Sequence, residues 1–370
     1  MINPLPSIAH WPPISDLKGA PSPSLLIDPL LIESNIRRMI SLVGADGVDR
    51  LRPHLKTHKM AEVVRLQCEA GITKFKAATL AELEMAAEVG AKDVLLAMQA
   101  VGPNIARLVQ AVERYPEMTL STIVDHPQAV SDLSRHCRHL VHPLRVFIDI
   151  DCGMHRTGIE IGPEFDALAS LIEEQDGVTL AGYHLYDGHL HDPAEAVRRA
   201  GVLKTLASVT KLTADLPELT VIVGGSPTFG LWAKNSSWEC SPGTTLLWDA
   251  GYAQSFPDLP FDIAAVLLTR VISKPGDKRL CLDLGHKAVA AENPLECRVF
   301  FPALPDVKIL GQSEEHLVVE TEDAGQFSPG DLLYALPRHI CPTVALHHSA
   351  HLVREGVLTE ERWIVAARKR

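Results

Sequence analysis

Between residues 51 and 249 the chain alternates short apolar segments with longer amphipathic ones. The short segments have the length and β-branched content of strands, and the longer ones repeat apolar residues at helical spacing. The predicted strands are 51–57, 72–78, 93–98, 119–125, 144–150, 178–186, 219–224 and 244–249. Predicted helices between them cover 60–70, 80–89, 103–114, 127–138, 163–175 and 194–213. Eight such units predict an α/β fold with an N-terminal (β/α)8 TIM-type barrel, because each parallel strand needs a crossover connection. A doubly wound open sheet is the alternative.

The sequence changes character on both sides of this region. Residues 260–370 carry short β-rich runs broken by Gly, Pro and Asp, without matching helices, which predicts a C-terminal β domain. The strand-like segment 24–27 has no barrel position, so we expect it to pair with that domain. The predicted parts are an N-terminal arm and strand contributed to the β domain over 1–24, the barrel over 25–255, and the β domain over 256–370.

Composition and charge indicate which kinds of partner and which cell compartment to expect. A formal net charge of -11 argues against nucleic-acid or anionic-membrane partners. The seven cysteines are odd in number and lack CxxC spacing, which indicates reduced thiols. With no apolar run of membrane-spanning length and no leader-like N-terminus, we expect a cytoplasmic protein.

The stretch 52–59 places five basic or imidazole side chains in eight residues at the predicted end of the first strand. Active sites of TIM-type barrels lie at this end of the strands. A lysine that is desolvated and crowded by cations keeps a free amine suited to imine formation. We therefore take Lys56 as the central reactive residue. The other basic residues of the stretch would set the electrostatic field and the geometry around its amine. Alone, the stretch would be interpreted as a solvated basic turn.

A glycine-rich loop follows the predicted seventh strand. Gly224 and Gly225 let backbone N–H groups approach an anion, and Ser226 and Thr228 add hydroxyl donors. The loop could equally be an ordinary turn, but the last strand ends are the usual phosphate site of this barrel. Thr244, entering the predicted eighth strand, joins this set.

Two other residues at the C-terminal ends of the predicted strands suit a flat, charged ligand. Arg156 follows the fifth predicted strand. Its planar guanidinium can donate hydrogen bonds in a fixed geometry to a phenolate or carboxylate. Tyr186 lies two residues after His184, so the two share a face of an extended segment, and Tyr186 could stack on such a ligand. A structural role, such as a surface salt bridge for Arg156, competes in each case.

The run 337–343 contains a candidate metal site. If it is extended, His339 and Cys341 project from the same face and could bind one divalent metal such as zinc. Two protein ligands leave positions for water or substrate, which suits a Lewis acid. The motif is weak, and a buried Cys beside a surface His is the commoner arrangement.

Four runs, in this order, resemble the D-threonine aldolase and D-serine dehydratase family: 52–59, 149–158, 224–228 and 339–341. The resemblance implies the alanine-racemase-like fold of pyridoxal phosphate enzymes, a barrel followed by a β domain, assembled as a homodimer. It implies that Lys56 carries the Schiff base with pyridoxal 5'-phosphate and that the Gly224 loop holds the phosphate. It further implies that Arg156 and Tyr186 lie against the cofactor ring, and that His339 with Cys341 holds zinc or manganese.

The resemblance leaves the exact reaction open between two types. His-x-Cys at 339–341 is typical of the dehydratases, whereas 186–189, 239–244 and 283–287 look most like the aldolases. We expect a metal-dependent lyase of D-3-hydroxy amino acids, aldolase-like, that releases glycine and an aldehyde. The alternatives are a D-serine or D-3-hydroxyaspartate dehydratase, an amino-acid racemase, and a pyridoxal phosphate-binding regulatory protein. The expected partner is a small D-amino acid, with no nucleic acid and no membrane.

Overall fold

The computed structural model describes residues 11–369 except residues 18, 46 and 214–217. The chain divides into two compact units. The barrel unit contains Met39–Lys56 and Val64–Gly243, and the β unit contains Thr57–Val63, Thr244–Arg368 and the described residues before Met39. The predicted limits at residues 24 and 255 stay a prediction, although residues 244–255 belong to the β unit by this division.

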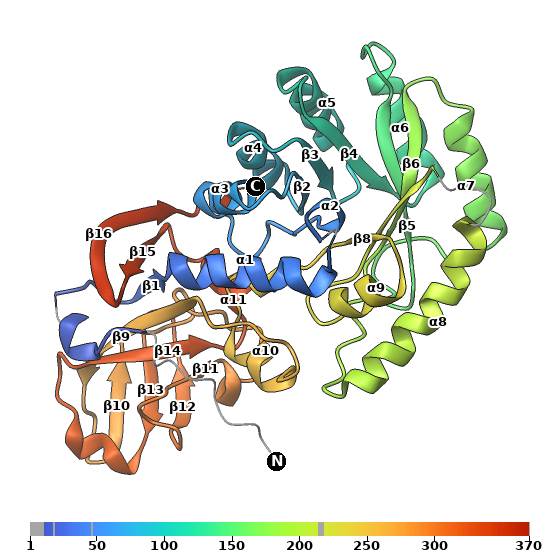
Figure 1. Cartoon of the computed structure of the whole chain (residues 1–370). Coiled ribbons are helices and arrows are strands. Elements are labelled where there is room, and N and C mark those ends of the chain that lie inside the picture. Colours follow the sequence, from blue (N-terminus) through green and yellow to red (C-terminus); the bar gives the residue numbers. More distant parts are fainter. Residues whose placement is uncertain (1–10, 18, 46, 214–217, 370) are drawn as a thin grey trace. The chain divides into compact units, whose positions relative to one another are not determined.

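A parallel sheet in the strand order β2-β3-β4-β5-β6-β7-β8 forms the barrel unit (Figure 1). Its strands are β2 (Lys74–Ala77), β3 (Asp93–Leu96), β4 (Thr119–Val124), β5 (Leu144–Ile150), β6 (Val178–Leu185), β7 (Thr220–Val223) and β8 (Glu239–Cys240). Residues 51–55 take the remaining position: Leu51 bridges to Cys240, and His54 bridges to Lys76. The Leu55 N–H also donates to the Lys76 carbonyl at 2.8 Å. The sheet therefore closes between β8 and β2, which confirms the TIM-type barrel.

Helices flank the outer side of the curled sheet, as α4 to α8 show in Figure 1. The helices up to β8 are α1 (Pro29–Val43), α2 (Gly47–Arg50), α3 (Ala61–Glu69), α4 (Leu80–Glu88), α5 (Pro103–Arg114), α6 (Pro127–Cys137), α7 (Pro163–Glu173), α8 (Glu195–Thr213) and α9 (Phe229–Asn235). Local sequence fixes their starts. At α4 the Thr79 hydroxyl accepts from the Glu82 N–H, and the Glu82 carboxylate accepts from the Ala78 N–H. This arrangement resembles a capping box and satisfies one amide of the first turn and one amide just before the N-cap. In the described part of the chain, no helix is long and apolar enough to cross a membrane.

Two predicted strands differ from the structure. The first ends at His54, because residues 55–58 form a turn. The predicted strand 244–249 is wrong: the eighth strand is β8, and Thr244–Leu246 is a 3-10 helix. Asp249 then caps α10 (Ala250–Ser255) by accepting from the Tyr252 N–H at 2.8 Å. The segment is thus an apolar, buried connector between β8 and a helix.

The interior of the barrel combines an apolar cluster with a buried ionic network. The apolar cluster consists of Leu95, Ile123, Phe147, Ala181 and Ile222. Arg52, only 2% exposed, donates to both carboxylate oxygens of Asp93 at 2.7 and 2.9 Å and to Glu239 at 2.7 Å. Arg52 thereby joins the closing segment to β3 and β8. Its side chain has a structural role here and is held by carboxylates at the start of the strands.

The β unit is built on a nine-stranded mixed sheet with the main order β12-β13-β10-β9-β1-β15-β16, in which β14 pairs with β9 and β11 (Figure 1). Its strands are β1 (Ser24–Ile27), β9 (Ala265–Ser273), β10 (Arg279–Leu282), β11 (Val299–Phe300), β12 (Lys308–Gln312), β13 (Leu317–Glu320), β14 (Leu332–Pro337), β15 (Ser349–Arg354) and β16 (Val357–Ile364). The early strand β1 runs antiparallel to β9 and parallel to β15. This confirms that the segment 24–27 pairs with the C-terminal strands. A short helix, α11 (Ile340–Val344), follows β14.

Candidate functional site

Lys56 lies in the turn directly after the segment that closes the barrel. Its backbone N–H donates to Nδ1 of His54 at 3.3 Å, so the imidazole two residues earlier helps to fix this turn. The Lys56 amine lies 5.5 Å from the centre of the Tyr186 ring. The structure thus brings together the amine of Lys56 and an aromatic surface, which follow different strands.

Three basic side chains lie near the ring of Tyr186, which follows β6 directly. The guanidinium carbon of Arg156 lies 4.9 Å from the ring centre, and the amine of Lys76 lies 5.9 Å from it, in addition to Lys56. The ring also requires Gly188, because a Cβ there would lie 2.5 Å from its edge. The predicted residues Lys56, Arg156 and Tyr186 therefore form one cluster whose positive charge suits an anionic, planar ligand.

Arg156 is carried by a loop that Asp151 organises. One carboxylate oxygen of Asp151 accepts from the N–H groups of Gly153 and His155, at 2.9 and 3.0 Å. Burial acts to raise the pKa of Asp151, but the N–H donors and the His155 ring outweigh it and hold this pKa below its ordinary value. Asp151, His155 and Glu160 are the one group of three possible metal ligands within the described chain. Since Asp151 is already bound within its loop, we assign this group to loop structure.

The predicted phosphate loop follows β7. Gly224 has a φ of +81°, and a Cβ there would lie 2.9 Å from Trp232, so conformation and space both require glycine. At Gly225 a Cβ would come within 3.2 Å of the Tyr186 ring, so this loop packs against the same aromatic surface. A loop without Cβ atoms at Gly224 and Gly225, near three basic side chains, fits a phosphate group.

Buried polar groups brace this loop. Asp187, 2% exposed, accepts from the Thr228 hydroxyl at 2.9 Å and from the Trp232 indole N–H at 2.7 Å. Burial raises the pKa of Asp187, and these two donors oppose the rise. The Ser226 hydroxyl oxygen accepts from the Gly243 N–H at 3.1 Å. Thr228 therefore supports the loop through Asp187, while Ser226 joins it to the segment after β8.

Replacing Asp187 with asparagine is expected to weaken cofactor binding about tenfold or more, because an amide replaces one acceptor oxygen with a donor facing Thr228 or Trp232. Fluorescence titration of the cofactor-free protein with pyridoxal 5'-phosphate measures the change. Asp192→Asn, at an exposed position, is the control. An unchanged dissociation constant for D187N would refute the bracing role.

Thr244 belongs to the β unit, where its hydroxyl lies 3.5 Å from the sulfur of Cys341. The hydroxyl of Thr57 lies 3.1 Å from the same sulfur. Two hydroxyl groups thus accompany Cys341, and Thr244 contacts the predicted metal ligand.

The run 337–343 is not extended throughout, so the condition under which His339 and Cys341 would project from one face of a strand is not met. The strand β14 ends at Pro337, His339 is the N-cap of α11, and Cys341 lies in its first turn. The helix starts here because the Ile340 N–H donates to the buried carboxylate of Asp249 at 3.0 Å, which satisfies an amide of the first turn. The two predicted ligands nevertheless interact, since Cys341 is among the groups that act on the pKa of His339.

His339 has surroundings that fit a metal ligand. Its Nδ1 lies 2.8 Å from Glu292, and such a carboxylate partner orients many metal-binding imidazoles. Burial acts to lower the pKa of His339, but Cys341, Asp249 and Glu292 raise it to about 9. This negative environment, with nitrogen and sulfur donors, fits a divalent cation of the zinc type.

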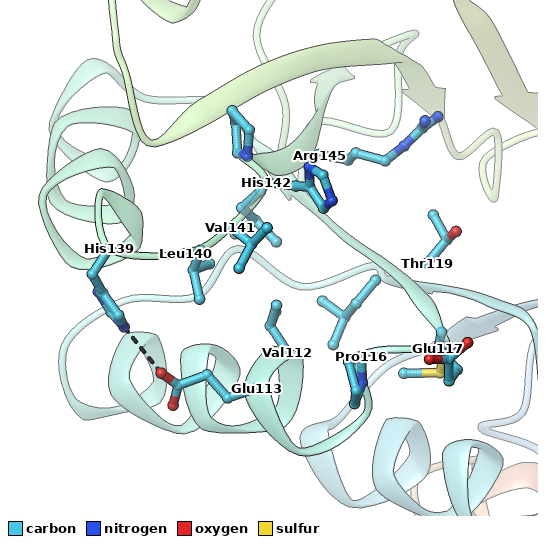
Figure 2. A pocket seen from close by; sticks show the side chains of 14 residues that line it. Val112, Glu113, Pro116, Glu117, Thr119, His139, Leu140, Val141, His142 and Arg145 are labelled. Carbon is cyan, nitrogen blue, oxygen red and sulfur yellow. Dashed lines mark hydrogen bonds and ion pairs between the residues drawn. The ribbon is translucent and has the colours of Figure 1, made fainter.

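A cavity of about 570 Å³ lies elsewhere in the barrel unit, at the N-terminal ends of β4 and β5. Figure 2 shows its lining, in which His139 reaches the Glu113 carboxylate at 3.1 Å. Ligand sites of this fold lie at the opposite ends of the strands. None of the predicted site residues lines the cavity, and we assign it no role.

Comparisons with known proteins agree with the two units. The family "Alanine racemase, N-terminal domain" matches residues 27–250. The chain belongs to this family. A second family, described as "Putative serine dehydratase domain", matches residues 264–353. The family resemblance inferred from the sequence motifs is thereby confirmed.

Several relatives match along nearly the whole chain. A D-threonine aldolase from Arthrobacter sp is 28% identical, over 96% of this chain and 95% of the relative. A D-threo-3-hydroxyaspartate dehydratase from Delftia sp. is also 28% identical, over 88% and 92%. The solved D-threonine aldolase from Filomicrobium marinum superposes with a TM-score of 0.86 at 26% identity, covering 95% and 97%. A D-threo-3-hydroxyaspartate dehydratase mutant solved in the metal-free form superposes with a TM-score of 0.76 at 25% identity. The match covers 94% of this chain and 98% of the mutant's chain.

Four polar residues near the predicted site have no role predicted from the sequence. They are Lys76, Asp149, Asp187 and Glu292. Lys76 and Asp149 lie within strands, whereas the candidate residues of the barrel were expected at the ends of the strands. The alternation of Lys74 and Lys76 around Phe75 was the available signal, since it places two lysines on one face. Glu292 lies in a segment without a recognisable pattern.

Proposed function

We propose that the protein is a pyridoxal phosphate- and divalent metal-dependent lyase of D-3-hydroxy amino acids, most similar in function to the D-threonine aldolases. The observation that carries the proposal is the Lys56 amine over the Tyr186 ring, with Arg156 on the same ring. Whole-chain relatives named as aldolases and dehydratases of such amino acids support it. The homodimer and the cytoplasmic location stay predictions.

The residues of the barrel unit fit the cofactor. Pyridoxal 5'-phosphate, when bound, withdraws electrons from the Cα of an amino acid. Lys56 would bind its aldehyde covalently, and Arg156 with Tyr186 would hold its ring. The loop from Gly224 to Thr228 would hold its phosphate, with Asp187 fixing the loop.

The residues of the β unit fit the metal. His339 and Cys341 would bind it, oriented by Glu292. A divalent cation with open positions acts as a Lewis acid on a hydroxyl group. The metal-free description of a solved dehydratase mutant supports a metal in this group of proteins.

The proposed reaction breaks the Cα–Cβ bond of the substrate. The β-hydroxyl loses a proton, its oxygen becomes the carbonyl of an aldehyde, and the electron pair left at Cα takes a proton to give glycine. Dehydration of D-serine or D-3-hydroxyaspartate is the second candidate. Cys341 favours it, since His-x-Cys is typical of the dehydratases, and the Delftia dehydratase is as similar as the Arthrobacter aldolase.

The test is incubation with D-threonine and with D-serine, with and without a metal chelator. Glycine and acetaldehyde from D-threonine are expected, and chelation is expected to reduce turnover at least about tenfold. L-threonine is the control for stereochemistry. Pyruvate from D-serine alone would indicate the dehydratase. Turnover that resists chelation would refute the metal site, and racemisation without cleavage would refute the lyase.

A further inference from the structure

Lys76 is a second buried amine in the barrel unit. It lies on β2, is 2% exposed, and faces the interior, because its cross-strand partner Leu95 belongs to the apolar interior cluster. Its amine lies 3.4 Å from Nε2 of His184 and 5.9 Å from the centre of the Tyr186 ring. The Lys56 amine faces the same ring.

His184 connects Lys76 to a carboxylate. Its Nδ1 lies 2.7 Å from one oxygen of Asp149, and the other oxygen accepts from the Thr157 hydroxyl at 3.0 Å. Because a carboxylate only accepts, Nδ1 of His184 carries the hydrogen and Nε2 presents a lone pair to Lys76. Burial lowers the pKa of His184, which keeps the ring neutral. Asp149, His184 and Lys76 therefore form a hydrogen-bonded line, which we call the Lys76 relay.

The surroundings of Lys76 allow both of its protonation states near neutral pH. Burial lowers its pKa to about 7, and the charge of Lys56 contributes to this decrease. The remaining charged or titratable groups that act on Lys76 or share its aromatic neighbour are Arg52, Asp149, Arg156, His184 and Asp187. A lysine with this pKa can accept a proton at a pH at which an ordinary lysine cannot.

We propose that Lys76 is the base that takes a proton from the Lys56 amine when Lys56 attacks a carbonyl group. The inference rests on the proposed function and deepens it. Attack forms a C=N bond and releases water, and it requires the lone pair of the attacking nitrogen. The proton leaves Nζ of Lys56 and binds Nζ of Lys76. The total charge of the two amines does not change.

The Lys76 relay stabilises the product of this transfer. The new ammonium group of Lys76 donates to Nε2 of His184, and Asp149 balances its charge through the imidazole. The face of the Tyr186 ring adds a cation–π contact. When Lys56 is released from its covalent bond, the proton returns to it. Lys76 takes the proton from the reacting nitrogen of Lys56, so its proposed role is that of a general base.

The experiment measures covalent capture of pyridoxal 5'-phosphate by the full-length, cofactor-free protein. Stopped-flow absorbance follows the rate from about pH 6 to about pH 10, the range that spans both ordinary and lowered lysine pKa values. K76M is expected to slow capture about tenfold or more near neutral pH. The loss is expected to disappear near pH 10, where hydroxide can remove the proton. K76R should behave like K76M, because arginine keeps the charge and cannot accept a proton.

Lys74→Met is the matched control. Lys74 lies on the same strand and face, but its amine is bound to Glu239 at 2.6 Å. This variant should keep the pH profile of the wild type. Thermal unfolding of each variant establishes that it is folded.

Each other outcome contradicts the proposal. Unchanged rates in K76M would overturn it, and equal slowing at every pH would indicate a structural role. Wild-type rates in K76R would assign the effect to charge alone. The assay contains no amino acid, so a chain that fails to cleave D-threonine but keeps this pH profile loses the proposed function only. A wild type that captures no cofactor refutes both proposals.

Discussion

A variant with alanine at Lys56 is expected to lose turnover of D-3-hydroxy amino acids by at least about a thousandfold. The amine over the Tyr186 ring is the group placed to bind the cofactor aldehyde, and alanine supplies no nucleophile. Turnover is measured by glycine release. Covalent capture is measured by borohydride reduction followed by peptide mapping, which should yield a modified Lys56 in the wild type and none at residue 56 in the variant.

Lys59→Asn is the control for this substitution. Lys59 belongs to the same basic stretch and has a φ of 54°, a conformation that asparagine tolerates well. K59N should keep covalent capture. Turnover in K56A within about tenfold of the wild type would remove Lys56 from the mechanism. Mapping is essential, because Lys76 is a second amine beside the same ring.

Arg52→Met is expected to lower the free energy of unfolding by about 3–5 kcal/mol. The substitution leaves the carboxylates of Asp93 and Glu239 without the guanidinium that they share in the barrel interior. It also removes the link between the closing segment and its two neighbouring strands. Denaturant unfolding followed by circular dichroism measures the change.

Two further variants test this explanation. Arg37→Met removes an exposed pair with Glu33, and should change stability by less than about 1 kcal/mol. Adding D93N and E239Q to R52M should recover part of the loss, because the two carboxylates, which are then unpaired with Arg52, are removed as well. An R52M midpoint equal to that of the wild type would show that the ionic network does not hold the barrel closed.

Much of the barrel could be predicted because each strand and the helix that follows it repeat the same local sequence pattern. The segment 244–249 shows the limit of this reasoning. A short apolar run is equally compatible with a buried strand and with a buried connector. What decides here is the Asp249 cap of the next helix together with the pairing of β8, and neither is visible in the run itself.

Site residues that directly follow a predicted strand could be predicted from their position in the sequence. Site residues inside a strand could not, because the pairing register of the strand decides which way their side chains point. Lys56, Arg156 and Tyr186 follow predicted strands, so fold geometry alone brings them to one end of the barrel. Lys76 lies inside a strand, and only the pairing of β2 shows that its amine points inward. The run 337–343 turns into a helix because the first amide of that helix donates to Asp249, which is far away in sequence.

The place of β1 has a consequence for how the chain is made. Leu25 pairs with Leu267 on one side and with Ala350 on the other, so this strand lies between two strands that are synthesised much later. During translation both of its edges stay unpaired while the barrel residues are added, and unpaired edges promote association between chains. A fragment starting after the barrel would lack this inner strand. Dissection of the protein at its apparent domain limits would therefore yield an incomplete sheet.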